Sequence, residues 1–260
     1  MIKIENIVLP SPEQWNSIIM GARNPMNSWG KSDSGCVDFE DWDCGHGISN
    51  GNGYAFVVGE NDLGLMKRLR NAGTDHRKFM RMITVYADIT APLYWWKEFD
   101  TYKVGTVANS CSTMHKIHTK EFTLEDFSHE HLITRLDDVC DWDIAAGPES
   151  VSSPFDILNI VVDALNRYRE QYLKTKDKKY WWQMIQLLPS SYNQKRTVML
   201  NYEVLANIYK SRKNHKLDEW SENHIDVDGN DMSPGLGMAG FCDWIKTLPY
   251  SGLITGKETE

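Results

Sequence analysis

Three polar side chains in the stretch from Leu188 to Trp220 could bind a ligand: Asn201, Asn207 and Arg212. Around them, apolar residues recur at steps of three, four and seven, which predicts a long helix with one buried side. These apolar residues are Val198, Leu205, Ile208 and Tyr209. On a helix, steps of six and five residues turn through about 240° and about 140°, so the three polar side chains share no stripe. Two interpretations remain open: an ordinary core helix, or a helix whose polar side chains contact a ligand or neighbouring subunits.

A second group of small polar residues follows Gly105 and runs from Asn109 to Ser112. Small residues after a glycine let a loop approach a phosphate or a flavin ring closely, although ordinary turns contain the same residues. Both interpretations stay open for this segment. Earlier in the chain, GTDHRKFMRM places His76 and Arg77 at the start of another element.

Candidate metal ligands crowd together in CVDFEDWDCGHG, residues 36–47. Zinc sites usually bring two ligand pairs, and this segment has no second pair nearby. His129 and His131 would share one face of a strand, but no third ligand accompanies them. The segment DVDGND at residues 226–231 lacks the glutamate that ends a calcium loop. We therefore expect a solvated acidic loop and no bound metal.

The chain has 260 residues, with 36 acidic against 28 basic side chains and a formal charge of −8. It should repel a phosphate backbone, which argues against binding of a DNA or RNA duplex unless basic residues cluster. No signal peptide opens the chain and no apolar run approaches 18 residues, so we expect no membrane partner. Scattered cysteines, odd in number, indicate free thiols and a soluble protein in a reducing cytoplasm. They are Cys36, Cys44, Cys111, Cys140 and Cys242.

A mixed α+β set of elements must position these residues. Apolar alternation and β-branched residues predict strands over residues 1–9 and 82–90. Helical patterns cover residues 59–73 and 155–180, a short helix begins at Phe241 and is ended by Pro249, and Ser11-Pro12-Glu13 opens another helix. We expect a long loop over residues 21–53, a turn-rich insertion over residues 221–240, and one domain over residues 1–260.

The longest predicted helix, from Phe155 to Tyr180, has one apolar side that we expect to face the core. That side consists of Ile157, Ile160, Val161, Ala164, Leu165 and Tyr168. Its basic end should be solvated and should favour the helix dipole.

Five segments, in the same order, resemble segments of the flavin-dependent thymidylate synthases, which methylate dUMP with a flavin and a folate carrier. They are GARN at 21–24, GTDHRKF at 73–79, TYKVGTVANSCS at 101–112, the stretch from Leu188-Pro189 to Arg212, and FCDWIKTLPY at 241–250. In the fourth segment, Asn201, Asn207 and Arg212 stand at the family's spacing without a gap. The resemblance implies an α+β fold with an antiparallel or mixed sheet, and a homotetramer whose sites form between subunits.

The resemblance also implies roles for individual residues. Residues implied to bind a nucleotide are Arg212, Lys103 and Ser112. Residues implied to bind the FAD cofactor are Asn201, Asn207, His76, Arg77 and Asn109. In such enzymes the flavin carries the chemistry, and the protein places it.

The chain departs from the family pattern where charged residues would hold the nucleotide. In residues 101–114, an arginine and a histidine are replaced by Thr101 and Tyr102, a glutamate by Ser110, and the last arginine by Met114; Ile185 replaces another arginine. Lys103 keeps a positive charge, but lysine lacks the planar fork with which arginine binds phosphate. An anionic substrate should therefore lose much of its affinity.

Three hypotheses follow. The chain is a non-catalytic nucleotide-binding protein, acting as a sensor or as a sponge that sequesters a nucleotide, as a phage-borne protein would. Alternatively, it is a divergent flavin-dependent thymidylate synthase that methylates dUMP or a related pyrimidine nucleotide. The third hypothesis is a structural protein that uses the fold for assembly. The sequence leaves open whether FAD is still bound.

Overall fold

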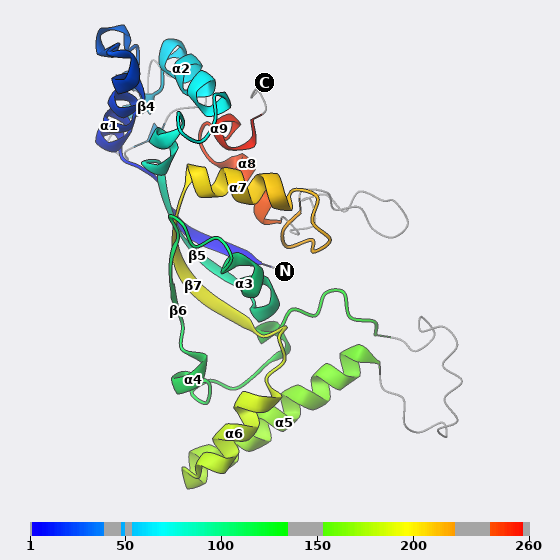
Figure 1. Ribbon diagram of the computed structural model, residues 1–260. Coiled ribbons are helices and arrows are strands. Elements are labelled where there is room, and N and C mark those ends of the chain that lie inside the picture. The colour runs from blue at the N-terminus through cyan, green and yellow to red at the C-terminus, as the bar shows by residue number, and fades with distance from the viewer. Residues whose placement is uncertain (1, 39–47, 50–53, 135–152, 222–239, 257–260) are drawn as a thin grey trace, which may run out of the picture. The chain divides into compact units, whose positions relative to one another are not determined.

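The computed structural model describes residues 2–38, 48–49, 54–134, 153–221 and 240–256 (Figure 1). Residues 39–47 of the predicted acidic loop and residues 222–239 of the predicted insertion lie outside the described residues. The structural statements below concern the described part of the chain.

Helices and strands both contribute to this fold. The strands are β1 (Lys3–Val8), β2 (Gly35–Asp38), β3 (Ile48–Ser49), β4 (Tyr54–Val57), β5 (Thr84–Pro92), β6 (Val107–Ser110) and β7 (Asn193–Asn201). The α-helices are α1 (Pro12–Arg23), α2 (Glu60–Asn71), α3 (Leu93–Phe99), α4 (Thr113–Lys116), α5 (Pro154–Thr175), α6 (Lys178–Leu187), α7 (Tyr202–Arg212), α8 (Phe241–Thr247) and α9 (Gly252–Thr255). Short 3₁₀ helices are η1 (Asn24–Met26), η2 (Trp29–Lys31), η4 (Lys78–Arg81) and η5 (Leu124–Asp126).

The strands form two sheets. The larger sheet has the order β1-β5-β7-β6. Along β5 every second residue is buried, including Val85, Ala87 and Ile89, which is the period of a strand with one buried face. The smaller sheet has the order β2-β4-β3, and both of its pairings are antiparallel. The predicted mixed α+β class is therefore confirmed.

The chain divides into two compact units, which are described separately. Unit 1 contains Thr90–Glu98 and Ser110–Lys195. Unit 2 contains Ile2–Ile89, Phe99–Asn109 and Arg196–Glu260. The single domain expected over residues 1–260 stays a prediction.

Helices α1 and α2 pack against each other in unit 2. The Ser11 hydroxyl accepts a hydrogen bond from the Gln14 backbone N–H at 3.3 Å, and the Gln14 side chain accepts one from the Ser11 N–H at 2.8 Å. This reciprocal cap, with Pro12 in the first turn, sets the start of α1. The predicted starts of both helices are confirmed. Their buried apolar side chains are Trp15, Ile18, Ile19, Ala22, Leu65, Met66 and Leu69.

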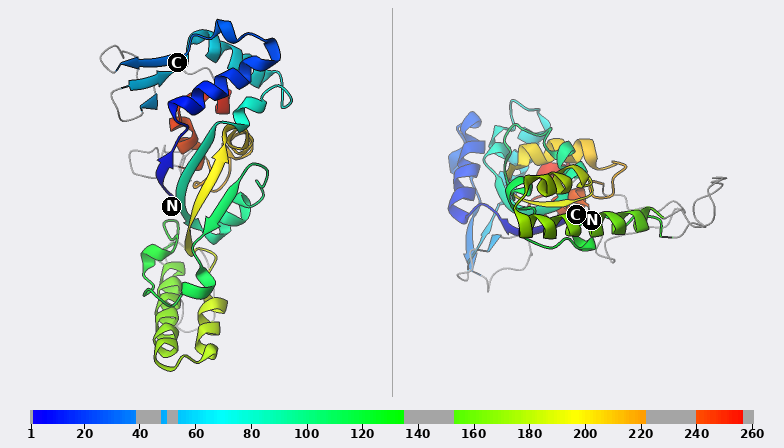
Figure 2. Two further views of the ribbon diagram at one scale, coloured as in Figure 1. Left: turned by 90° about the vertical axis from the view of Figure 1, so that its left-hand side faces the viewer. Right: turned by 90° about the horizontal axis from the view of Figure 1, so that it is seen from below.

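Helices α5 and α6 lie side by side in unit 1 (Figure 2). Helix α5 ends at Thr175, where Lys176 takes the left-handed conformation with φ of 58°. The Asp177 side chain then accepts a hydrogen bond from the Lys179 backbone N–H at 2.9 Å and caps α6. The single helix predicted from Phe155 to Tyr180 is therefore wrong beyond Thr175, because this cap starts a new helix.

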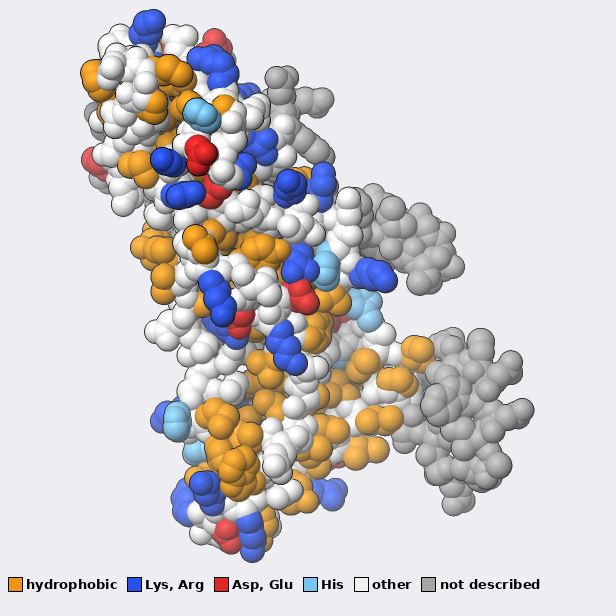
Figure 3. Space-filling view, viewed as in Figure 1, with side chains coloured by type: hydrophobic (Ala, Val, Ile, Leu, Met, Phe, Trp, Pro, Cys, Tyr) orange, Lys and Arg blue, Asp and Glu red, His pale blue; other side chains and the backbone are white. Residues whose placement is uncertain are grey.

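The buried side of α5 only partly matches the predicted side: Leu165 is buried and Val161 and Tyr168 pack against the core, whereas Ile157 and Ile160 do not. Leu158, Val162 and Leu165 join Met184 of α6 in the core of unit 1. Ile157 and Ile160 are 53% and 59% exposed, and Figure 3 shows hydrophobic side chains along α5. The helix carries two neighbouring apolar stripes, and helical spacing does not decide which one its neighbours cover.

The long loop predicted over residues 21–53 is partly wrong. Helix α1 extends to Arg23, η1 and η2 follow it, and β2 and β3 pair with β4. These strands are short, and their partner β4 lies beyond the predicted loop. The residue types within 21–53 therefore give no sign of the pairing that makes these segments strands.

Two findings bear on the protein's surroundings. Within the described residues, no helix combines the length and the hydrophobicity needed to cross a bilayer. Cys36, Cys111 and Cys242 are free thiols. Cys44 and Cys140 lie outside the described residues.

Candidate functional site

The junction between β7 and α7 positions Asn201. Residues 193–201 form a strand in which Val198 is buried, and α7 begins only at Tyr202, so the predicted long helix is wrong before this residue. The cause is the pairing of β7 between β5 and β6, which apolar spacing along the chain does not reveal. Asn201 caps α7, because its Oδ1 accepts a hydrogen bond from the Val204 backbone N–H at 3.0 Å.

Asn201 and Arg212 contact the same segment, residues 101–106 of unit 2. They are eleven residues apart, about three helical turns, so they project in similar directions. The Asn201 Nδ2 donates to the Gly105 carbonyl at 3.3 Å. The Arg212 Nε donates to the Tyr102 hydroxyl at 2.9 Å. These two predicted site residues therefore hold segment 101–106 against α7.

Aromatic rings surround the Arg212 guanidinium. Its central carbon lies 5.6 Å from the centre of the Tyr102 ring and 5.4 Å from that of the buried Trp220. A planar guanidinium stacks well on aromatic faces. Tyr102 occupies the position where the resemblance expects a histidine, so this replacement supplies a partner inside the chain for the arginine expected to bind a nucleotide.

A pocket of about 300 Å³ lies beside this segment. It is lined by Phe99, Asp100, Tyr102, Lys103, Thr106 and Ala108. Lys103, expected to bind a nucleotide, shares the pocket with the carboxylate of Asp100, which accepts a hydrogen bond from Arg196 at 2.8 Å. Arg196 already balances the Asp100 carboxylate, so among the described residues that line this pocket Lys103 alone offers a positive charge to a phosphate.

Asn207 lies on another side of α7, next to Arg77. The Arg77 Nη2 lies 3.5 Å from the Asn207 Oδ1 and donates to the Glu203 Oε1 at 3.0 Å, and its Nε lies 2.8 Å from the Glu203 Oε2. Glu203 is buried in the first turn of α7, where the helix dipole favours a negative charge. The fork of Arg77 is thus fixed by a carboxylate, and the structure brings together two residues expected to bind the cofactor.

Arg77 and Asn207 line a pocket of about 170 Å³, which we call the cationic pocket. Three further basic residues line it: Arg70 from α2, and Lys210 and Lys213 from α7 and its C-terminal end. Its remaining walls are Ala206, Tyr209, Ile254 and Thr255. Lys and Arg side chains gather over α7 in Figure 3. Four positive charges around so small a space make it a candidate site for an anion.

Backbone carbonyls of α9 fix the position of the Arg70 side chain. Its Nε donates to the Leu253 carbonyl at 3.2 Å and its Nη2 to the Ile254 carbonyl at 3.1 Å. Burial lowers the pKa of Arg70, the neighbouring charge of Arg77 lowers it further, and Glu203 raises it. Like charges are thus held close together, a cost that a bound anion would relieve.

The other predicted site residues lie elsewhere. His76 is exposed, and its backbone N–H donates to the Gly73 carbonyl at 3.1 Å. Asn109 is exposed on β6. Ser112 belongs to unit 1, where its hydroxyl caps α4 by accepting from the His115 N–H at 3.0 Å. Neither His76 nor Asn109 is among the described residues that line the two pockets.

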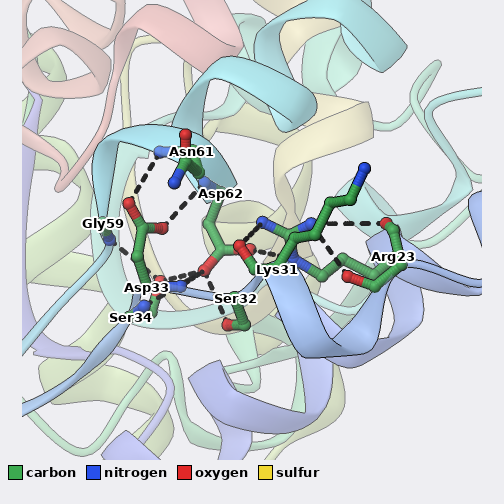
Figure 4. Close-up of polar contacts among 9 residues, drawn as sticks. Arg23, Lys31, Ser32, Asp33, Ser34, Gly59, Asn61 and Asp62 are labelled. Atoms are coloured by element: carbon green, nitrogen blue, oxygen red, sulfur yellow. Dashed lines mark hydrogen bonds and ion pairs between the residues drawn. The ribbon is translucent and has the colours of Figure 1, made fainter.

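Arg23, part of the first segment of the resemblance, has a structural partner, Asp62 of α2 (Figure 4). The two side chains form an ion pair and are 3% and 1% exposed. Asp62 Oδ2 also accepts hydrogen bonds from the Ser32 and Ser34 hydroxyls at 2.7 and 2.6 Å. Arg23 donates to the Lys31 carbonyl at 2.8 Å. This network fastens residues 28–34 to α2.

No group of three or more His, Cys, Asp or Glu residues suited to a metal occurs within the described ranges. Of the acidic segment at residues 36–47, only its first three residues are described.

Sequence reasoning missed the three basic residues that complete the cationic pocket. Lys210 and Lys213 follow Asn207 at steps of three, so helical spacing alone would have placed them on one side of α7. Arg70 lies far away in sequence and carries no local signal of its position. The sequence identifies Tyr102 only as the residue that replaces a histidine of the family pattern, because nothing in the sequence indicates that it contacts Arg212.

Comparison with known proteins gives a likeness of fold. No protein-family model and no curated protein matches the sequence. A crystal structure of thymidylate synthase X from Helicobacter pylori, with FAD and dUMP, matches over 98% of this chain and 97% of that chain, with a TM-score of 0.55 and 12% identity. A second Helicobacter pylori structure of flavin-dependent thymidylate synthase, complexed with FAD and dUMP, covers 83% of this chain and 85% of that chain, with a TM-score of 0.48 and 13% identity. At this identity the likeness shows the fold alone, and the predicted thymidylate synthase-like fold is confirmed at that level.

Proposed function

We propose that this protein is a nucleotide-binding protein that does not catalyse thymidylate synthesis and that acts as a sensor or a sponge. One observation carries the proposal: Arg77 and Asn207 share a pocket with Arg70, Lys210 and Lys213. A small pocket walled by four cations suits the phosphate groups of a nucleotide. The fold adds support, since the similar Helicobacter pylori structure contains FAD and dUMP.

The absence of catalysis is inferred from the surroundings of Arg212. The Tyr102 hydroxyl accepts from its Nε, and the rings of Tyr102 and Trp220 contact its guanidinium. The Nε is thus bound within the chain and the rings fix the plane of the guanidinium, so fewer of its donors are preorganised for a negatively charged substrate. Thr101 and Met114, which stand where the family pattern has arginines, supply no positive charge in their place.

Purified full-length protein tests this proposal against the alternative, a divergent thymidylate synthase. We expect a colourless protein whose thermal unfolding temperature rises with dUMP, because a ligand at 100 times its Kd stabilises the folded state by about 2.7 kcal/mol. The same titration with FAD shows whether the cofactor is still bound. Yellow protein with near-equimolar flavin that methylates dUMP would establish the enzyme instead.

Asn207→Ala should weaken the nucleotide-dependent shift of the unfolding temperature, because it removes a polar wall of the cationic pocket. Ser211→Ala, at an exposed position of the same helix, is the control. A shift by neither dUMP nor FAD in the wild-type protein would leave the structural hypothesis.

The proposal includes self-association into a homotetramer, which the resemblance implies. The exposed apolar side of α5 supports it, because Ile157 and Ile160 of one copy could be covered by another copy.

A further inference from the structure

The cationic pocket contains more positive charge than one phosphate group needs. Four cationic side chains line it, and Glu203 is the carboxylate that pairs with one of them, Arg77. Four cations against one carboxylate leave three formal positive charges. A phosphate monoester carries about −1.5 to −2 at neutral pH. A diphosphate or triphosphate matches the excess better than a monophosphate does.

The pocket is smaller than sites that enclose a whole ligand. Its volume of about 170 Å³ lies below the roughly 300–1,000 Å³ of pockets that bury a drug-sized molecule. That space suits a short phosphate chain, while a base and a sugar would have to remain outside. The volume of the cationic pocket therefore favours binding of the phosphate groups of a ligand over binding of its base and sugar.

The donors are of two kinds. The two arginines are held in place, Arg70 by the carbonyls of Leu253 and Ile254 and Arg77 by Glu203. The two lysines, Lys210 and Lys213, have no ion pair with a carboxylate among the described residues. Held arginines lose little entropy on binding, and flexible lysines can follow successive phosphates along a chain.

We propose that the cationic pocket binds the polyphosphate tail of a nucleoside di- or triphosphate in preference to a monophosphate. This inference rests on the proposed nucleotide-binding function and deepens it, since it names the ligand class. The nucleoside lies outside the pocket, so the phosphate chain provides most of the affinity, and binding weakens steeply with added salt.

Isothermal titration calorimetry of the full-length protein tests the inference with two series of probes. The first is inorganic phosphate, pyrophosphate and tripolyphosphate, and the second is dUMP, dUDP and dUTP. We expect Kd to fall at least tenfold from the monophosphate to the triphosphate in both series. The Lys210→Ala/Lys213→Ala double variant should weaken triphosphate binding at least tenfold, because charge-assisted hydrogen bonds are lost.

Arg68→Ala and Lys216→Ala are matched controls, since they remove one exposed charge each from α2 and from the segment after α7 without lining the pocket. Both should bind tripolyphosphate like the wild-type protein. Unchanged thermal unfolding of the double variant would show that it folds.

Each outcome separates the two proposals. Equal affinity for dUMP and dUTP overturns the polyphosphate inference and leaves nucleotide binding intact. Binding of tripolyphosphate without binding of any nucleotide supports the pocket and overturns the nucleotide-binding function. Equal loss of affinity in the double variant and in the controls would place the phosphate elsewhere and overturn the inference.

Discussion

At the scale of single residues, one replacement changes what an arginine can do. Arg212 stands at the spacing of a nucleotide-binding arginine, yet its Nε donates to Tyr102 and its charge lies over two aromatic rings. Tyr102 therefore binds the Nε of the guanidinium and, with Trp220, fixes the orientation of its plane.

Asp62 links the Arg23 network to pH. Burial alone would raise the pKa of its carboxyl, but hydrogen bonds from Ser34, Ser32 and Arg23 and from the Asp33 backbone together lower it below the ordinary value of 3.8. Because the folded-state pKa is the lower one, Asp62 contributes its full stability above the unfolded pKa. That contribution should be lost as the pH falls through the folded-state value.

Urea unfolding at pH 7, 5 and 3 measures this contribution. Asp62→Asn should cost about 3–5 kcal/mol at pH 7, because it leaves Arg23 buried without a counter-charge. The cost should shrink at pH 3, because the unfolded wild-type chain takes up a proton at Asp62 before the folded protein does, and this lowers the stability that the ionised carboxylate provides. Glu60→Gln, at an exposed position in the first turn of the same helix, is the control. A cost for Asp62→Asn that stays constant with pH would contradict this account.

At the scale of elements, α7 and the residues at its two ends contribute to two separate sites in unit 2. Asn201 and Arg212 hold segment 101–106, while Asn207, Lys210 and the residues after the helix line the cationic pocket. The helix packs against α8, α9 and η4, which keep it from turning about its axis. The pocket also depends on α9, because Arg70 binds the carbonyls of Leu253 and Ile254 there.

Two glycines should respond oppositely to the same substitution. Gly256 ends α9 with φ of 74°, and a Cβ there would lie 2.4 Å from the Arg70 Nη1. Gly256→Ala should therefore destabilise the fold by about 1 kcal/mol or more. Gly64 lies inside α2, where a Cβ meets only an ordinary contact at 3.6 Å, so Gly64→Ala should stabilise by about 0.5–1 kcal/mol.

Chemical denaturation of both variants measures the difference. A Gly256→Ala protein as stable as the wild type would show that backbone conformation at Gly256 is not what limits that position, and destabilisation by Gly64→Ala would contradict the second prediction. Weaker tripolyphosphate binding in Gly256→Ala would further tie Arg70 to the pocket.

At the scale of the whole molecule, the proposed self-association can be tested on α5. Ile160→Asp places a charge on its exposed apolar side, so it should lower the molar mass measured by light scattering after size exclusion. Since Ile160 is 59% exposed, thermal unfolding of the monomer should change little. Gln186→Asp, at an exposed position of α6, is the control. A wild-type protein that is monomeric at high concentration would rule out self-association.

The sequence by itself determined the elements whose signals are local. Ser11 and Pro12 start α1 within one turn, the apolar spacing of α2 lies within twelve residues, and the alternation in β5 is contained in the strand. Backbone hydrogen bonds and caps join residues a few positions apart, so their residue types suffice to predict them.

Only the tertiary structure decided the rest. Val198 lies on a strand because β7 pairs with β5 and β6, and one of two apolar stripes on α5 is buried because α6 packs there. Tyr102 meets Arg212, and Arg70 meets the residues around Asn207, across long stretches of chain. Such contacts depend on how elements pack, and single-sequence patterns carry no information about which distant residues become neighbours.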